Sequence, residues 1–285
     1  MALLFLVPSL FGLLFLNLIP MLIALYTSMT DWVYTDGLFN WNFVGLENFV
    51  LLFQDDVFIQ ALVNTIIFTV VTVPIGILVA LVVASLIDNY CNVKVAGIIR
   101  IALYMPNICN IVATSTIWRA LYSSYGPFTN LMRALGWSNP PRWLGNENWA
   151  LPAVILVAMW AKLGYNVFIY GASMAALPSD LYESAALDGA NKRQQFFHLT
   201  VPLLSATTFF LTITGIISSF QVFGYSKVMT QGGPLNATNT MVYYIYTTAF
   251  KYYRTGYGSA ISMVLFLILL AITVIQWVHN NKQED

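Results

Sequence analysis

Charged residues are scarce in this sequence. Only 8% of its 285 residues are Asp, Glu, Lys or Arg, and 59% are hydrophobic, whereas roughly a quarter of a soluble domain is charged. No water-soluble fold can bury that much apolar surface. The 12 basic residues balance the 12 acidic ones, so there is neither a basic field for nucleic acid nor an acidic tail. We therefore expect an integral membrane protein that does not bind nucleic acid.

Cysteine and histidine are also rare, with two of each. Cys91 and Cys109 are isolated from each other and from His198 and His279, which excludes a disulfide framework and a zinc-ligand spacing. The apolar segments lack a Ser/His, Asp/Asp or His-Glu-x-x-His set, and the chain lacks the Gly-x4-Gly-Lys-Ser/Thr phosphate loop. We expect no catalytic residue, no metal site and no ATPase site of its own.

Long apolar runs dominate what is present. A helix that crosses a bilayer core of about 30 Å needs about 20 mostly apolar residues, and barrel strands are shorter than these runs. We predict an all-α membrane fold with six transmembrane helices. Their expected ranges are 2–27, 61–87, 98–121, 150–177, 202–225 and 259–278. No repeat or low-complexity linker divides the chain, so 1–285 is taken as one domain.

Charges in the loops bear on orientation. Residues 30–60 carry five acidic and no basic side chains, whereas the next loop has Lys94 and the loop after the fourth segment has Lys192 and Arg193. By the positive-inside rule these charges favour 30–60 outside and the two later loops, with both termini, in the cytoplasm. The count alone leaves orientation open, because five basic residues fall on the outer side: Arg133, Arg142, Lys227, Lys251 and Arg254.

The first apolar segment could in principle be a cleaved signal peptide. Residues 2–27 lack the basic region and cleavage site of a signal peptide, and the abrupt apolar start leads us to expect that a short N-terminal tail has been removed.

Aromatic side chains crowd the outer loops and favour an interfacial belt, while a few of them are candidates for docking an external partner. They are Trp137, Trp143, Trp149, Tyr243, Tyr244 and Tyr246.

The loop 178–201 carries the strongest functional signal. Pro178 stops the fourth segment, and Asp180 with Glu183 has the spacing of a capping box for a short helix. Gly189 permits a left-handed exit. Residues 191–198 then predict a second short amphipathic helix before Pro202 opens the fifth segment. We expect a helix-turn-helix along the membrane surface.

This loop resembles the coupling loop of binding-protein-dependent ATP-cassette importer permeases. The family pattern Glu-Ala-Ala, Gly, Ile-x-Leu-Pro is matched in spacing by Glu183-Ser184-Ala185, Gly189 and Leu199-x-Val201-Pro202, with three mild substitutions. The motif 229–234, Met-Thr-Gln-Gly-Gly-Pro, and the Tyr-rich run that follows resemble the loop before the last span in the maltose-type sugar subfamily.

The resemblance implies an importer in the bacterial cytoplasmic membrane. Its partners would be a second, homologous permease, two ATPase subunits that bind the ATP and Mg²⁺, an extracytoplasmic solute-binding protein and lipid. Glu183 would anchor or order the coupling helix, Ala185 would allow close packing and Gly189 would supply the turn. The expected coupling residues are Tyr182, Glu183, Ser184, Ala185, Asp188, Gly189 and Pro202. An ordinary solvated helix charge is the alternative for Glu183.

Polar residues within the fourth and fifth segments are candidates for the solute pathway, because such groups are costly in lipid, and in the maltose-type family the sugar site lies on the helices that flank the coupling loop. The candidates are Lys162, Gly164, Tyr165, Asn166, Tyr170, Ser218, Ser219, Gln221 and Phe223. Ser and Thr also bond to their own helix or join neighbouring helices. Lys162 has three open roles: it can snorkel, pair with a carboxylate of the partner permease, or meet an acidic solute.

The main alternative is a transporter driven by an ion gradient. It would show inverted repeats, broken mid-membrane helices and buried acidic residues. We find none of these in the sequence, because every Asp and Glu falls outside the six predicted segments. A channel would not need the ordered loop. The identity of the carried sugar stays open.

Overall fold

The computed structural model describes residues 2–37 and 40–284, and this part of the chain is almost entirely helical. The β-structure among these residues is an isolated antiparallel bridge between Thr30 and Phe43. Two compact units divide the chain. The first comprises Met1–Val63, Phe220–Phe223 and Asn239–Asp285, and the second comprises Asn64–Ser219 and Gly224–Thr238.

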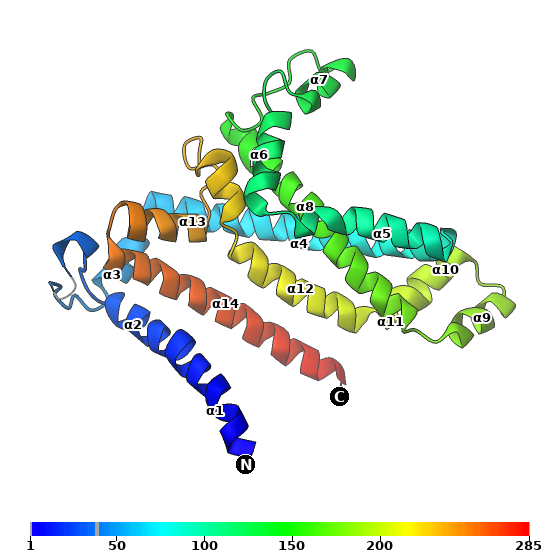
Figure 1. Ribbon diagram of the computed structural model, residues 1–285, viewed down its shortest axis with the longest axis horizontal. Coiled ribbons are helices and arrows are strands. Elements are labelled where there is room, and N and C mark those ends of the chain that lie inside the picture. The colour runs from blue at the N-terminus through cyan, green and yellow to red at the C-terminus, as the bar shows by residue number, and fades with distance from the viewer. Residues whose placement is uncertain (1, 38–39, 285) are drawn as a thin grey trace. The chain divides into compact units, whose positions relative to one another are not determined.

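In the described part of the chain, four helices are long and apolar enough to cross a membrane. The first, Leu6–Thr27, joins α1 (Ala2–Leu13) to α2 (Ile19–Thr27) through a π-helical turn, Leu14–Leu18. The others are α4 (Asp56–Tyr90), α8 (Glu147–Ala175) and α14 (Thr255–Glu284) (Figure 1). Two bent pairs raise the number of candidate spans to six. The all-α membrane fold is therefore confirmed at the level of four to six spans.

The segment predicted as one span over 98–121 is broken. Its parts, α5 (Val93–Ile108) and α6 (Ile111–Leu121), meet at 97°. Pro106 in the last turn of α5 cannot donate a backbone hydrogen bond, and Cys109 is extended, with ψ 142°. Asn110 then caps α6 by accepting a hydrogen bond from the amide of Val112 at 2.8 Å. The expectation that no apolar segment is broken was wrong.

The fifth segment also differs from the predicted range 202–225. The helical stretch Lys192–Leu203 bends by 63° into α12 (Ser205–Phe220). Gln221 and Phe223 therefore follow the end of α12 and do not lie on it. The carbonyl of Val222 accepts a hydrogen bond from Thr240 Oγ1 at 2.9 Å, which holds residues 220–223 to the first unit.

The second unit is built around α4, α5, α8 and α12 (Figure 1). Its buried core includes Val73, Leu81, Val167 and Leu211. In lipid the hydrophobic effect does not drive membrane helices together. Their association therefore depends mainly on close van der Waals packing, which small residues allow. A Cβ at Gly164 would overlap the carbonyl group of Leu103 on α5, and one at Gly171 would lie 3.2 Å from Arg100 Cζ. Gly164 lets the backbones of α5 and α8 approach closely, and Gly171 leaves room for the Arg100 guanidinium group.

The first unit is tied together at Asp55. Its Oδ1 accepts hydrogen bonds from the amides of Val57 and Phe58 at the start of α4, at 2.9 and 3.2 Å. Its Oδ2 accepts from the hydroxyls of Tyr244 on α13 (Met241–Tyr246) and Tyr257 on α14, at 2.5 and 2.7 Å. Desolvation raises the pKa of Asp55, but these four hydrogen bonds outweigh it and hold the pKa below its ordinary value.

We expect Tyr244→Phe to lower the free energy of unfolding by about 1 kcal/mol at neutral pH, because a hydrogen bond to a partly exposed carboxylate is lost. Tyr252→Phe, at an exposed position in the same unit, is the matched control. A lowered folded pKa stabilises the fold above the unfolded pKa of about 3.9, and this contribution is lost as the pH falls through the folded value.

The measurement is thermal unfolding of both variants in detergent between neutral pH and about pH 3. Tyr244→Phe should unfold at a lower temperature than the control at neutral pH, and the gap should narrow in acid. Equal unfolding temperatures at neutral pH would show that the Tyr244 hydrogen bond contributes nothing.

Candidate coupling loop and solute pathway

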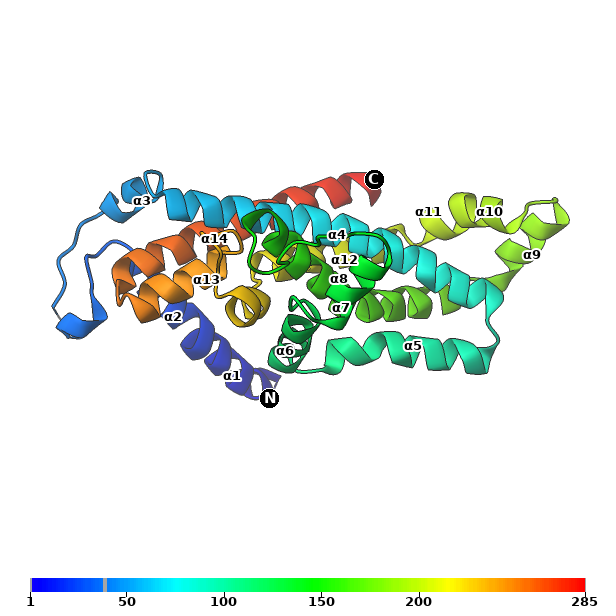
Figure 2. The same ribbon diagram turned by 90° about the horizontal axis from the view of Figure 1, so that it is seen from above.

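The predicted coupling loop is an ordered pair of short helices. α9 (Ser179–Leu187) begins shortly after α8 ends at Ala175, and α10 (Lys192–Gln195) follows. In both views α9 lies beyond the ends of α4 and α5, whereas α10 lies alongside them (Figures 1 and 2). The first helix of the loop therefore projects from the helical body of the second unit.

The capping box lies in the second helix and not in the first. Pro178 precedes α9 without a side-chain cap, so Asp180 already lies inside the first turn and the predicted box with Glu183 was wrong. Asn191 Oδ1 accepts from the amide of Gln194 at 2.9 Å, and Gln194 Oε1 accepts from the amide of Asn191 at 2.8 Å. This reciprocal pair fixes the start of α10.

The exit from α9 follows a Schellman motif. The amide of Gly189 donates to the carbonyl of Ala186 at 3.1 Å, and the amide of Ala190 donates to the carbonyl of Ala185 at 2.9 Å. Gly189 has φ +86°, which a residue without Cβ adopts readily. The predicted left-handed turn at Gly189 is confirmed.

Two side-chain links hold the helices of the loop together. The hydroxyls of Tyr182 and Thr200 lie 3.1 Å apart, and the buried Gln195 donates through Nε2 to the carbonyls of Tyr182 and Ala190, each at 3.3 Å. Helix 191–198 was predicted as one piece. The structure instead ends α10 at Gln195 and continues through a π-helical turn, Phe196–Thr200, into α11 (Val201–Leu203), which contains Pro202.

The surface of the loop combines a free carboxylate with a shallow hollow. Glu183, Ser184 and Asp188 are exposed, and the Glu183 side chain has neither an ion pair nor a hydrogen bond within residues 2–37 and 40–284. The same loop also carries a hollow of about 370 Å³. Its lining consists of Ala185, Asp188, Gly189, Ala190, Gln194, Gln195, His198 and Leu199. Such a surface can receive side chains of another protein.

Lys162 on α8 faces α12. Its ammonium group donates to Ser218 Oγ, whose hydroxyl donates in turn to the carbonyl of Gly215 at 3.0 Å. The structure therefore brings together two of the predicted pathway residues. A charged group held by one neutral hydroxyl retains the capacity to bind an additional acceptor.

Asn166 and Ser219 are both buried, each 6% exposed. The Asn166 amide has no hydrogen-bond partner among the described residues, which makes it available to a solute hydroxyl. Ser219 Oγ lies 3.3 Å from Thr72 Oγ1 on α4. Thr72 is not among the predicted pathway residues, although a Thr within an apolar run was the available signal in the sequence.

The remaining predicted residues lie elsewhere. Tyr170 is fully buried, and its hydroxyl lies 2.8 Å from Thr208 Oγ1 on α12. Tyr165 packs against the core and Gly164 against α5. Gln221 is exposed, and Phe223 contacts the rings of Tyr243 and Tyr246 in the first unit, with centroids 6.3 and 5.2 Å away. The structure does not bring these residues together in one site, so their roles in the solute pathway stay predictions.

Aromatic rings gather at the opposite end of α8 from the coupling loop. Trp137, Trp143 and Trp149 contact one another with ring centroids 5.5–5.6 Å apart, and Trp143 Nε1 donates to Thr129 on α7 (Pro127–Ala134) at 3.0 Å. The 29 residues of α8 span about 43 Å. The cluster and the loop therefore lie at the two ends of a helix that is long enough to cross a hydrocarbon core of about 30 Å.

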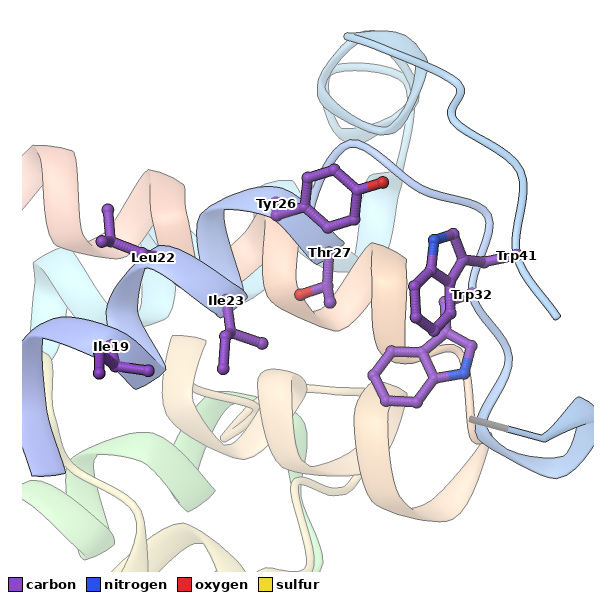
Figure 3. A pocket seen from close by; sticks show the side chains of 7 residues that line it. All are labelled: Ile19, Leu22, Ile23, Tyr26, Thr27, Trp32 and Trp41. Atoms are coloured by element: carbon purple, nitrogen blue, oxygen red, sulfur yellow. The ribbon is translucent and has the colours of Figure 1, made fainter. Parts of the chain in front are cut away.

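An apolar pocket of about 440 Å³ lies on the first unit (Figure 3). Ile19, Leu22 and Ile23 of α2 line it, with the indoles of Trp32 and Trp41 at one end. Trp32 Nε1 already donates to the carbonyl of Gly37 at 3.0 Å, and Thr27 Oγ1 bonds with Ala24 and Ser259. The pocket has few polar groups to offer a saccharide, and none of the predicted pathway residues lines it.

These features define a multi-pass helical membrane protein with an ordered helix-turn-helix loop between two of its candidate spans. Residues 51–282 match the family described as the inner membrane component of binding-protein-dependent transport systems, and the chain belongs to this family. It is therefore a permease subunit of an importer, and the alternative of an ion-gradient-driven transporter is set aside.

Known relatives can be aligned with nearly the whole chain. The probable ABC transporter permease protein YurN of Bacillus subtilis (strain 168) is 33% identical, over 99% of this chain and 97% of that protein. The lactose transport system permease protein LacF of Rhizobium radiobacter is 33% identical, over 93% and 90%. A bacterial alginate ABC transporter, solved in complex with an alginate pentasaccharide-bound periplasmic protein, shares the fold at a TM-score of 0.83 with 22% identity, over 95% and 91%.

Proposed function

We propose that this chain forms one half of the translocation pathway of an ATP-driven sugar importer and receives its ATPase at the loop 178–201. The observation that carries the proposal is the ordered pair α9 and α10, which exposes Glu183 and carries a hollow whose lining includes the small residues Ala185, Gly189 and Ala190. An ordinary connector between two spans needs neither a Schellman exit nor a capping box.

The proposed topology has six spans, in which α5 with α6 and α10–α11 with α12 each count as one bent span. The loop lies in the cytoplasm, together with both termini, and the acidic stretch 30–60 and the tryptophan cluster lie outside. A second permease, two ATPase subunits and a solute-binding protein complete the importer. ATP and Mg²⁺ bind to the ATPase subunits and not to this chain.

The proposed substrate is a saccharide. LacF is named for lactose and the solved transporter for alginate, so related permeases are assigned both a neutral and an acidic sugar. In this chain Lys162, Asn166 and Ser219 supply a charged donor, an amide and a hydroxyl on α8 and α12. Hydroxyl groups of a sugar can bond to each of them.

We expect Asn166→Ala and Ser219→Ala each to weaken transport about fivefold, since each removes one hydrogen bond worth about 1 kcal/mol. Thr273→Ala is the matched control, because Thr273 bonds to the carbonyl of Leu269 on its own helix. The readout is saccharide uptake by proteoliposomes that contain the complete importer. Unchanged uptake in both variants, with normal assembly, would remove these residues from the pathway.

A further inference from the structure

A small basic pocket lies where the end of α4 meets α10. It measures about 180 Å³, and its lining runs from Val82 to Tyr90 on α4 and includes Lys192, Arg193 and Phe196 of the loop. Both cations are exposed, and neither has an ion pair within the described residues. The nearby carboxylate of α4, Asp88, is instead directed to Arg100 of α5, at 3.8 Å. The pocket therefore carries two positive charges and no negative one.

An apolar row on α4 leads to this pocket. Ile75, Leu78, Val82 and Leu86 are exposed on the chain, and their spacing of three or four residues places them on one face of the helix. From Ile75 to Leu86 the row is about 16 Å long, close to one leaflet of a hydrocarbon core of about 30 Å. Tyr90 continues the row at its polar end.

The apolar row is about as long as the hydrocarbon layer of one leaflet and ends at two cations. Together they match the shape and charge of one anionic phospholipid. Two other occupants fit less well. A soluble ATPase would satisfy the cations but would leave the apolar row inside the membrane uncovered, and a helix of a partner permease would cover the row but would bring no anion to Lys192 and Arg193. Basic pockets beside cytoplasmic helix ends favour anionic head groups.

We propose that an anionic phospholipid binds here, with its phosphate on Lys192 and Arg193 and an acyl chain along the α4 row. The inference depends on the proposed function in one respect, namely that the loop lies at the cytoplasmic membrane surface. The lipid then rests against the same α10 whose capping box fixes the coupling loop, so its occupancy stabilises the order of that loop.

The test is native mass spectrometry of the full chain in detergent, titrated with phosphatidylglycerol or phosphatidylcholine. Phosphatidylglycerol should bind more tightly, and Lys192→Ala/Arg193→Ala should weaken its binding about thirtyfold, at about fivefold for each cation. Lys192→Arg/Arg193→Lys should retain binding, because it keeps both charges. Lys94→Ala, an exposed cation of α5 outside the pocket, should leave binding unchanged.

Equal affinity for the two lipids, or an equal affinity of the double alanine variant and the native chain for phosphatidylglycerol, would overturn the proposal. The titration needs no ATPase. Co-purification of the ATPase with each variant is measured in parallel, so a failure of the lipid site and a failure of the proposed coupling function give different results.

Discussion

In a Glu183→Lys variant we expect the ATPase subunit to dissociate from the permease and ATP-driven uptake to fall by about thirtyfold or more. Loss of one charge of a buried interfacial pair costs about 2–5 kcal/mol, and reversal adds repulsion. Glu183 is exposed on α9 and has no ionic partner within the described part of the chain. Lysine is as good a helix former as glutamate, so α9 itself should persist.

The measurement is co-purification of the ATPase on a tagged permease, with Glu147→Lys as the control. Glu147 is also an exposed helical glutamate, but it begins α8 at the end remote from the loop. Thermal unfolding of the permease alone should change little for Glu183→Lys, whereas Glu147→Lys places a cation in the first turn of α8 and should unfold at a slightly lower temperature. A Glu183→Lys permease that retains its ATPase and its uptake would show that this carboxylate is an ordinary solvated charge.

The second large effect is expected at Gly164, where Gly164→Ala should lower the free energy of unfolding by about 3 kcal/mol or more. Overpacking in a close-packed core costs typically about 1–3 kcal/mol, and here the added Cβ would overlap the backbone carbonyl of Leu103, which cannot rotate away as a side chain can. The α5–α8 contact would have to open.

Gly97→Ala is the control, because its effect on stability should have the opposite sign to that of Gly164→Ala. Gly97 is also helical, on α5, but a Cβ there meets nothing within 4 Å. Alanine is better than glycine in a helix by about 1 kcal/mol, so this variant should be neutral or more stable. Unfolding temperatures and the yield of monodisperse protein are compared for both. Equal stability of the two variants would contradict the close contact between α5 and α8.

The sequence was most informative where lipid or the backbone imposes a strict requirement. A bilayer demands long apolar helices, which located α4, α8 and α14 to within a few residues. A left-handed helix exit demands a residue without Cβ, which identified the turn at Gly189. Both predictions follow from local physical chemistry and need no knowledge of tertiary contacts.

Tertiary arrangement could not be predicted in the same way. Cys109 and Asn110 lie within a continuous apolar run, and only the cap on α6 reveals that they form a 97° corner. Gln195 links the two loop helices through carbonyls 5 and 13 residues away, and the Thr72–Ser219 contact joins residues 147 positions apart. Such partners depend on how helices pack, which a single sequence does not specify.

The central claim is that this chain moves a saccharide only when an ATPase and a solute-binding protein act on it. The direct test is saccharide uptake into proteoliposomes that contain either the complete importer or the purified chain alone. We predict uptake by the complete importer with ATP and binding protein, and none when either is omitted. Uptake by the chain alone under an ion gradient would contradict the account.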